Sequence, residues 1–404
     1  MTNICLYFQV HQPIRLRKYT LFEIGHHKNY FDDKKNEQIM RKIAKKCYNP
    51  TNKIIKDLIA KHSDFKVAYS ITGTALEQFK KYAPEVLQSF KELADTGKVE
   101  FLSETYHHSL SFLFDKDEFK EQVKQHQKMI KKEFGQKPKI FRNTELVYNN
   151  ELAKLAENMG YKGILAEGWD PILKLRSPDN VYKPKGSRIK LLLKNYKLSD
   201  DVAFRFSDKN WKGWPLTAEK YASWIAPIQG DSINLFMDYE TFGEHQWADT
   251  GIFNFLKHLP AELKKHNISF QHPSDLLKIE PKGEINAPHV ISWADMERDV
   301  SAWLGNKMQQ SAAKHLYELR QEILASKDNE LIESWRKMTT GDHFYYMCTK
   351  WFNDGDVHKY FNAYETPYEA YITFMNILQD VRLKIKKQQP AFASISKFIK
   401  EVDV

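Results

Sequence analysis

Cysteine is scarce in this chain of 404 residues. Cys5, Cys47 and Cys348 form no CxxC pair and are odd in number, so no disulfide framework is expected. The first residues also show no basic leader followed by an apolar stretch, which is the pattern of a secretory signal. Together these absences predict a reducing, cytoplasmic setting.

Long apolar runs are missing as well. Nowhere do about eighteen apolar residues follow one another without interruption, so we expect no membrane span and no membrane partner. The net charge of +9 would suit a nucleic-acid ligand. However, the basic residues are scattered through helical stretches, and no zinc-finger, RNA-recognition or basic-arm pattern accompanies them. We therefore interpret the charge as solvated surface and expect no nucleic-acid partner; the oligomeric state is left unknown.

Several catalytic signatures are also absent. The sequence has no HExxH, HxH or CxxC for a metal, no GxGxxG or GxxxxGK[ST] for a phosphate group, and no GxSxG for a serine nucleophile. We expect neither a metal nor another cofactor. Aromatic residues, in contrast, are plentiful and make up 13% of the chain. This content mildly favours a carbohydrate ligand, because sugar rings stack on aromatic faces.

Up to about residue 275, short apolar runs alternate with amphipathic helical stretches, which indicates an α/β fold with a largely parallel sheet. The predicted strands are Ile4–Val10, Phe65–Ile71, Val99–Ser103, Lys139–Phe141, Gly163–Ala166, Ile189–Leu193, Val202–Phe206 and Ile233–Met237. Helices are predicted between them, over about 38–61, 74–95, 117–134 and 150–159, and then over 296–325, 329–338 and 366–387. We therefore predict a catalytic β/α domain at residues 1–275 and a helical domain at 276–404.

Polar side chains gather where six of the predicted strands end. They include His11, Glu77, Glu104, His107, His108, Arg142, Glu145, Glu167, Trp169 and Asp238. In a closed barrel, the C-terminal strand ends converge on one rim, which is where active sites form. Carboxylates together with aromatic residues are typical of sites that cleave glycosidic bonds. In such a site, one carboxyl group protonates the leaving oxygen, and another either attacks the sugar carbon or activates a water molecule.

Five separated segments resemble the conserved regions of glycoside hydrolase family 57, in particular its α-amylase-type members. They are HQP at 11–13, GTALEQ at 73–78, FRNTELVYNN at 141–150, MDYETFGEHQ at 237–246 and SWADMERDVSAWLGN at 292–306. Because GDHFYYM at 341–347 also resembles the family's helical region, the resemblance covers nearly the whole chain. It implies an incomplete seven-stranded (β/α) barrel followed by a C-terminal helical bundle domain that contributes to the active-site cleft.

The resemblance further implies retaining hydrolysis of α-1,4-glucosidic bonds in starch- or glycogen-like glucans or maltooligosaccharides, through a covalent glycosyl-enzyme. Glu145 matches the family's nucleophile and Asp238 its general acid/base. From the residues themselves, we expect Arg142 to keep Glu145 ionised, and Tyr239 and Phe242 to desolvate Asp238. A retaining mechanism predicts that the two carboxyl groups lie about 5–5.5 Å apart.

The candidate substrate-binding residues come from the same rim and from the fifth segment. His11 is expected to bond sugar hydroxyls in the reacting subsite, because it matches the first family segment. The other candidates are Glu77, Glu104, His107 and His245 as sugar ligands or scaffold, Trp169 and Trp303 as stacking platforms or core, and Asp295 and Asp299 as side chains reaching into the cleft.

Other functions stay open. A 4-α-glucanotransferase would use the same site, since transfer differs from hydrolysis only in the acceptor, whereas the chain looks short for a branching enzyme. A metal-dependent carbohydrate deacetylase would need His and Asp ligands on the early strands, where HQP offers one His. A non-catalytic glucan-binding protein is disfavoured because Glu145 and Asp238 are both present.

Overall fold

The computed structural model describes residues 3–27, 29–350 and 363–388. By their contacts, the described residues divide into two compact units. The first takes those within Met1–Pro13, Lys34–Phe112 and Lys116–Val300, and the second those within Ile14–Asp33, Leu113–Asp115 and Ser301–Val404. None of the described helices has the length and apolar character needed to cross a membrane.

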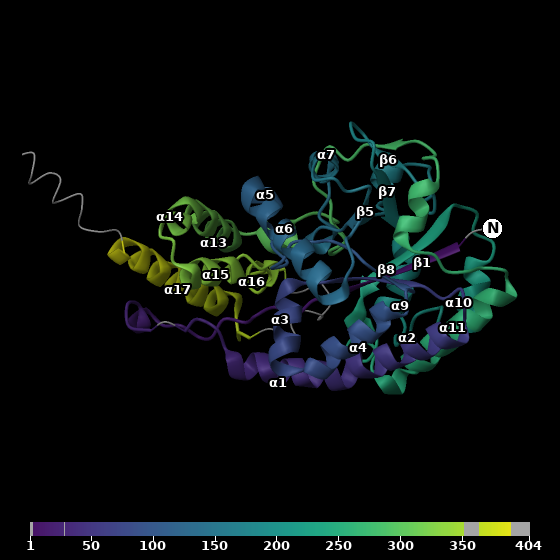
Figure 1. The fold of residues 1–404 in the computed structure, drawn as a ribbon, viewed down its shortest axis with the longest axis horizontal. Helices are drawn as coiled ribbons and strands as arrows, with labels where there is room; N and C mark the ends of the chain where they lie inside the picture. The colour runs from purple at the N-terminus through teal and green to yellow at the C-terminus, as the bar shows by residue number, and fades with distance from the viewer. Residues whose placement is uncertain (1–2, 28, 351–362, 389–404) are drawn as a thin grey trace, which may run out of the picture. The chain divides into compact units, whose positions relative to one another are not determined.

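Strands and helices alternate up to residue 300 (Figure 1). The strands are β1 (Asn3–Val10), β2 (Val67–Ile71), β3 (Val99–Phe101), β4 (Ile140–Phe141), β5 (Gly163–Glu167), β6 (Lys183–Pro184), β7 (Lys190–Lys194), β8 (Ser232–Asp238) and β9 (Glu284–Ile285). The α-helices are α1 (Asp33–Ile43), α2 (Asn49–Lys61), α3 (Gly73–Tyr82), α4 (Pro84–Asp95), α5 (Ser111–Phe114), α6 (Lys116–Phe134), α7 (Asn150–Asn158), α8 (Asp170–Leu173), α9 (Tyr196–Ala203), α10 (Ala218–Ile225) and α11 (Ile252–Lys265).

Parallel strands form a ring in the first unit. β3, β2, β1 and β8 are neighbours in one sheet, and β4, β5 and β7 in another. Ser103 joins the two sheets, because its N–H donates to Ile140 O at 3.0 Å and its carbonyl accepts from the Arg142 N–H at 2.8 Å. On the other side, the Asn195 N–H after β7 donates to Asn234 O in β8 at 2.9 Å. The order is therefore β7-β5-β4-β3-β2-β1-β8, which confirms the predicted seven-stranded barrel.

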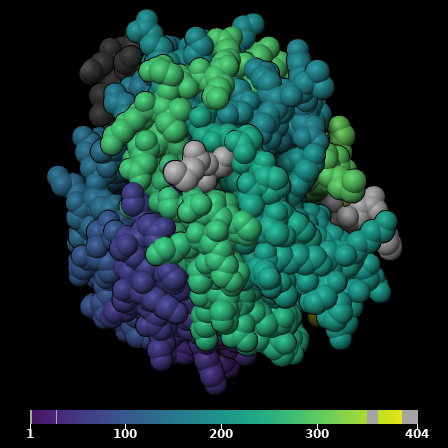
Figure 2. All heavy atoms as spheres, turned by 90° about the vertical axis from the view of Figure 1, so that its right-hand side faces the viewer, coloured from purple at the N-terminus to yellow at the C-terminus, as the bar shows by residue number. Residues whose placement is uncertain are grey.

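Side-chain alternation along the strands fills the ring. Tyr7 of β1, Phe236 of β8 and Leu165 of β5 belong to one buried cluster, and the rings of Tyr7 and Phe236 pack edge to face with centroids 5.4 Å apart. The alternate residue Phe8 is buried as well, because helices cover the outside of a parallel sheet. Two of these helices, α2 (purple) and α11 (green), lie side by side (Figure 2).

One predicted strand is wrong. Residues 202–206 form the end of α9 and the turn that follows it. The side chain of Asn195 caps α9 by accepting the Leu198 N–H. Phe206 is buried because it packs against Phe255 of α11, with ring centroids 5.3 Å apart. A short apolar run of this kind has the same composition in a buried strand and in a buried helix end.

Two predicted helices are interrupted. The helix predicted over 74–95 breaks at Ala83, whose φ is −148°, because Pro84 disfavours a helical conformation in the residue before it. Residues 296–300 are not helical, and Arg298 has a φ of 53°. Short β9 was not predicted; it pairs with β6. The first unit therefore extends beyond the predicted domain boundary at residue 275.

The second unit is helical in its described part. Its helices are α12 (Ser301–Leu304), α13 (Lys307–Glu318), α14 (Arg320–Ala325), α15 (Asn329–Met338), α16 (Gly341–Tyr345) and α17 (Pro367–Gln388). The segment 14–33, between β1 and α1, belongs to the same unit. Asp380 of α17 holds this segment by accepting the Gly25 N–H at 2.5 Å and the Tyr30 hydroxyl at 2.6 Å. The predicted helical bundle is confirmed.

The barrel interior gives a first testable prediction. Leu165→Ala removes a side chain that is 1% exposed and leaves a cavity, so we expect the free energy of unfolding to fall by about 2–5 kcal/mol. The matched control is Leu175→Ala, because Leu175 is fully exposed. Urea denaturation of both variants measures the difference, and equal midpoints would contradict the assignment of Leu165 to the core.

Candidate active site

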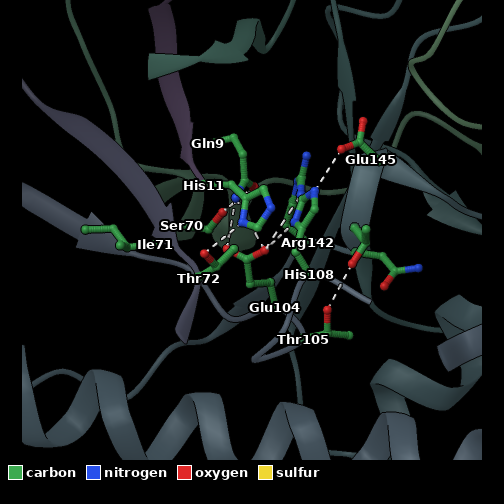
Figure 3. A network of polar contacts seen from close by, with 12 residues as sticks. Gln9, His11, Ser70, Ile71, Thr72, Glu104, Thr105, His108, Arg142 and Glu145 are labelled. Carbon is green, nitrogen blue, oxygen red and sulfur yellow. Dashed lines mark hydrogen bonds and ion pairs between the residues drawn. The ribbon is translucent and has the colours of Figure 1, made fainter. Parts of the chain in front are cut away.

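The C-terminal ends of the first four barrel strands bring polar side chains together. Figure 3 shows Gln9 and His11 from the end of β1, Ser70 and Thr72 from β2, Glu104 and His108 from the segment after β3, and Arg142 and Glu145 from the segment after β4. The site therefore lies on the rim where a β/α barrel carries its chemistry.

Glu145 stands in a tight turn directly after β4. It lies in a 3-10 turn, Thr144–Leu146, and has a φ of 56°. The Asn143 side chain closes the turn by donating to Val147 O at 3.0 Å. Residues other than glycine rarely adopt a positive φ, and such strain concentrates at functional sites. The turn presents a carboxylate that is 15% exposed.

The two oxygens of the Glu145 carboxylate have different partners. Oε1 is 2.7 Å from Nε2 of His108, and Oε2 accepts the indole N–H of Trp293 at 2.7 Å. The backbone N–H of Trp293 also donates to Glu145 O at 3.1 Å. The position and the rotation of this carboxylate are therefore both held.

His108 bridges two carboxylates and carries a positive charge between them. Its Nδ1 lies 3.3 Å from Oε2 of Glu104. Burial by itself lowers the pKa of His108, but its hydrogen bonds to Glu104 and Glu145 raise it to about 9. Burial likewise raises the pKa of Glu104, but the hydrogen bond from His108 and the charge of Arg142 lower it to about 2. Glu104 is thus anionic and His108 cationic at neutral pH.

Arg142 lies near a second carboxylate of the site. Its Nη1 is 3.8 Å from Glu104 Oε2, and the expectation that Arg142 keeps Glu145 ionised stays a prediction. The Arg142 guanidinium lies over the Trp293 ring, 4.9 Å from its centroid. A cation that is bonded to Glu145 is His108, whose backbone φ is 51°.

Glu104 is tied to the barrel interior. The Gln9 amide donates to Glu104 Oε1 at 3.2 Å, and the Gln9 carbonyl accepts the Ser70 hydroxyl at 2.8 Å. The Glu104 N–H donates to Nδ1 of His126, whose Nε2 is 2.9 Å from Ile71 O. Because burial lowers the pKa of His126, this ring is neutral and donates through Nε2. Glu104 is therefore a fully buried support for His108.

Asp238 is the last residue of β8 and lies in register with Gln9 on β1. The neighbouring Tyr239 begins the 3-10 turn Tyr239–Thr241 and packs against Phe8 and Tyr69. The desolvation of Asp238 by Tyr239 and Phe242 stays a prediction. A second acid, Glu240, is close enough to interact: burial and then the charge of Asp238 raise the pKa of Glu240 to about 8.

The turn after Asp238 is clamped by a π-helical segment, Ala44–Tyr48, between α1 and α2. The Tyr48 hydroxyl donates to Glu240, and the Cys47 thiol donates to Tyr239 O at 3.3 Å. Gly243 has a φ of 106°, and a Cβ there would lie 2.0 Å from Lys46 O. Such π-bulges often mark functional positions.

His11 and Glu77 lie at the rim as predicted. The His11 ring stacks on that of His108 with centroids 4.0 Å apart, and its Nδ1 is 2.9 Å from Thr72 Oγ1. Glu77 accepts the Tyr106 hydroxyl at 2.8 Å. His107 is fully buried beside Tyr106. Whether His107 is a sugar ligand or scaffold stays open, while its neighbour His108 contacts Glu104 and Glu145.

The remaining candidates are more dispersed. Trp169 precedes α8 and is half-buried, as are His245 and Asp295, whereas Asp299 is exposed. Trp303, in α12 of the second unit, is 2% exposed and packs near Tyr345. Sugar-binding roles for these residues stay predictions, and so does the separation of Glu145 and Asp238.

The most informative residues that the sequence did not single out are His108, Trp293 and Glu240. His108 was visible at a strand end but not distinguished from His107. Trp293 lies within the fifth segment, in which the sequence analysis chose only Asp295, Asp299 and Trp303 as candidates.

Comparison with known proteins gives consistent matches. The model of Glycosyl hydrolase family 57 matches residues 5–292. A putative alpha-amylase of Methanocaldococcus jannaschii is 47% identical over 399 residues, which cover 94% of this chain and 84% of that protein. Alpha-amylase 1 of Dictyoglomus thermophilum is 25% identical over 259 residues, which cover 61% of this chain and 36% of that protein.

Solved structures share the fold. A 4-alpha-glucanotransferase from Thermococcus litoralis matches with a TM-score of 0.67 and 16% identity, over 95% of this chain and 60% of that chain. A GH57 branching enzyme from Thermococcus kodakaraensis matches with a TM-score of 0.68 and 14% identity, over 97% of this chain and 95% of that chain. At these identities the likeness concerns the fold alone.

The charge on His108 gives a pH prediction. Its pKa is raised from 6.5 to about 9 in the folded chain, so its contribution to stability is complete below pH 6.5 and is lost as the pH rises through about 9. The difference in unfolding free energy between the native chain and His108→Gln should therefore shrink over this range. Urea denaturation at a series of pH values measures it.

The control is His266→Gln, which changes an exposed histidine after α11 and should show no comparable trend. A His108→Gln difference that stays constant between pH 6.5 and 9 would contradict a charged His108.

Proposed function

We propose that this chain, which belongs to glycosyl hydrolase family 57 because that family's model matches residues 5–292, hydrolyses α-1,4-glucosidic bonds with retention of configuration. Its substrates would be starch- or glycogen-like glucans and maltooligosaccharides. Membership of the family makes the chain a glycoside hydrolase, and a relative 47% identical is named putative alpha-amylase. Glu145 is proposed as the nucleophile and Asp238 as the general acid/base.

The observation that carries the proposal is the environment of Glu145. A nucleophilic carboxylate must be ionised and fixed in rotation. The His108 imidazolium and the Trp293 indole donate to its two oxygens, each at 2.7 Å, and hydrogen bonds to a charged form favour that form. This arrangement suits a nucleophile and would be unfavourable for a proton donor.

Asp238 suits the complementary role. It ends β8 next to Gln9 in the ladder, on the same rim as the Glu145 turn. Burial and then the charge of Asp238 raise the pKa of the neighbouring Glu240 to about 8, so a second acid lies close to Asp238. Because His108 and Trp293 favour the ionised form of Glu145, the general-acid role is proposed for Asp238.

The mechanism then has two steps. Asp238 protonates the glycosidic oxygen while Glu145 attacks C1, so that the C1–O bond to the leaving sugar breaks and an ester to Glu145 forms. Asp238, now ionised, takes a proton from water, and the water oxygen attacks C1 from the opposite face, so that the C1–O ester bond to Glu145 breaks and its carboxylate is released. Two inversions retain the configuration. His11, which stacks on His108, is proposed to bond hydroxyls of the reacting sugar.

A 4-α-glucanotransferase would share the first step and differ in the second, where a sugar hydroxyl replaces water. Incubation with a defined maltooligosaccharide series separates the two activities. We expect products shorter than each substrate, as hydrolysis requires. Products longer than the substrate would assign the chain to transfer instead, and no reaction with any α-glucan would remove the proposed substrate class.

Azide rescue tests the two carboxyl roles separately. Glu145→Ala should lose activity on an aryl α-maltooligoside, and added azide should give the β-glycosyl azide, because one displacement inverts C1. Asp238→Ala should lose about 10²–10⁴-fold in activity, and azide should give the α-glycosyl azide through the glycosyl-enzyme.

The matched control is Glu284→Ala, which removes an exposed carboxylate on β9 and should leave activity unchanged. Undiminished activity in Glu145→Ala would refute its assignment as nucleophile, and azides of exchanged configuration would reverse the two roles.

A further inference from the structure

Trp293 contacts Glu145 through both its backbone and its side chain. The indole N–H donates to Glu145 Oε2 at 2.7 Å, and the backbone N–H donates to Glu145 O at 3.1 Å. Because His108 bonds Oε1, the carboxylate is held at both oxygens, by a cation on one side and by a neutral donor on the other. Removing either donor would free its rotation.

Two cations lie over the indole ring. The Arg142 guanidinium is 4.9 Å from the ring centroid and Lys194 Nζ is 5.3 Å from it. Arg142 is fully buried, and none of its guanidinium nitrogens has a hydrogen-bond partner among the described residues. A buried cation without hydrogen bonds depends on its remaining contacts, which here are Glu104 at 3.8 Å and the face of Trp293. The position of the Trp293 ring is thus coupled to the charges of Arg142 and Lys194.

The segment that carries Trp293 is anchored by Arg298. This guanidinium donates to Trp293 O, and it pairs with Glu167 and Asp200 at 3.1 Å each. Lys194 pairs with the same two carboxylates, at 3.6 Å from Glu167 and 2.9 Å from Asp200. Two cations and two anions from β5, β7, α9 and the segment after Ile291 therefore form one network.

The side chains of this network are largely buried. The side chains of Glu167 and Lys194 are 0% and 4% exposed, and those of Asp200 and Arg298 are 11% and 13% exposed. Ion pairs shielded from solvent are little screened, and loss of one member leaves an uncompensated charge. Asp295 and Arg298 also have positive φ values of 54° and 53°, which persist where surrounding contacts impose them. The shape of residues 293–298 is therefore set by the network.

We propose that Trp293 is a positioning residue for the nucleophile, and that the network of Arg298, Lys194, Glu167 and Asp200 holds it in place. The indole N–H fixes the rotation of the Glu145 carboxylate and stabilises its anion before attack on C1. This inference rests on the proposed function, because it takes Glu145 as the nucleophile.

The direct test is Trp293→Phe, which keeps an aromatic ring against Arg142 and Lys194 and removes the indole N–H. The readout is the rate at which a 5-fluoro-α-glycosyl fluoride labels Glu145: the C1–O bond to Glu145 forms as fluoride leaves, and the mass of the chain increases. We expect labelling to slow about 10- to 100-fold, as loss of a hydrogen bond to a charged group implies.

A second readout separates positioning from packing. The lost hydrogen bond favoured the ionised carboxylate, so the acidic limb of the kcat/KM profile should move to higher pH, with a larger effect on kcat than on KM. The charged and titratable groups at the surrounding strand ends, His108, Glu104, Arg142 and Asp238, are unchanged in the variant. Arg298→Gln should act in the same direction, and Arg298→Lys should restore part of the rate.

The matched control is Trp247→Phe. Trp247 is 51% exposed and contacts Lys46, so this variant should label at the native rate. Thermal unfolding establishes that every variant is folded.

Native labelling and a native acidic limb in Trp293→Phe would overturn the inference and leave Glu145 as nucleophile. Slower labelling with an unmoved limb would overturn it too, because packing alone would then explain the loss. If the native chain were not labelled at Glu145 at all, the proposed function itself would fail.

Discussion

The imidazole of His108 bonds Glu104 with one nitrogen and Glu145 with the other, and the arrangement of the rim depends on this bridge. Without its charge, the buried Glu104 would lose its nearest cation, and breaking a buried pair of this kind costs about 3–5 kcal/mol. Through Glu104, the bridge reaches Gln9 of β1. Through Glu145 it reaches Trp293. One protonated ring thus connects the barrel interior to the proposed nucleophile.

The same barrel gives its two proposed catalytic acids opposite surroundings. Glu145 is met by donors, whereas Asp238 shares its turn with Glu240, an acid whose pKa burial and the charge of Asp238 raise to about 8. Tyr239, the first residue of the 3-10 turn after β8, packs in an aromatic cluster with Phe8 and Tyr69. The π-helical segment Ala44–Tyr48 contacts this turn through Cys47 and Tyr48. The end of β8 therefore carries a pair of interacting acids beside a packed aromatic cluster.

Residues 293–298, which lie outside the barrel strands, also contribute to the surroundings of Glu145. They carry no regular structure that a periodic pattern would reveal, and their shape follows from buried ion pairs made by Arg298. The proposed role of Trp293 depends on that anchoring. Residues 293–298 are thus held by ion pairs and not by a helix or a strand. The geometry around Glu145 therefore depends on residues that lie far from it in the sequence.

The sequence by itself predicted the seven barrel strands and the helical second part and, through family segments, led to the proposal of Glu145 and Asp238 as the catalytic pair. These features can be recognised locally, because apolar runs and sequence motifs consist of residues that are close together in the chain. Only the tertiary structure decided that His108 lies between Glu104 and Glu145, that Trp293 donates to Glu145, and that residues 202–206 end a helix. A backbone φ of 51° at His108, and contacts between residues 37 positions apart or 148 positions apart, arise from barrel closure. Closure leaves no local signal in the residues that it brings together.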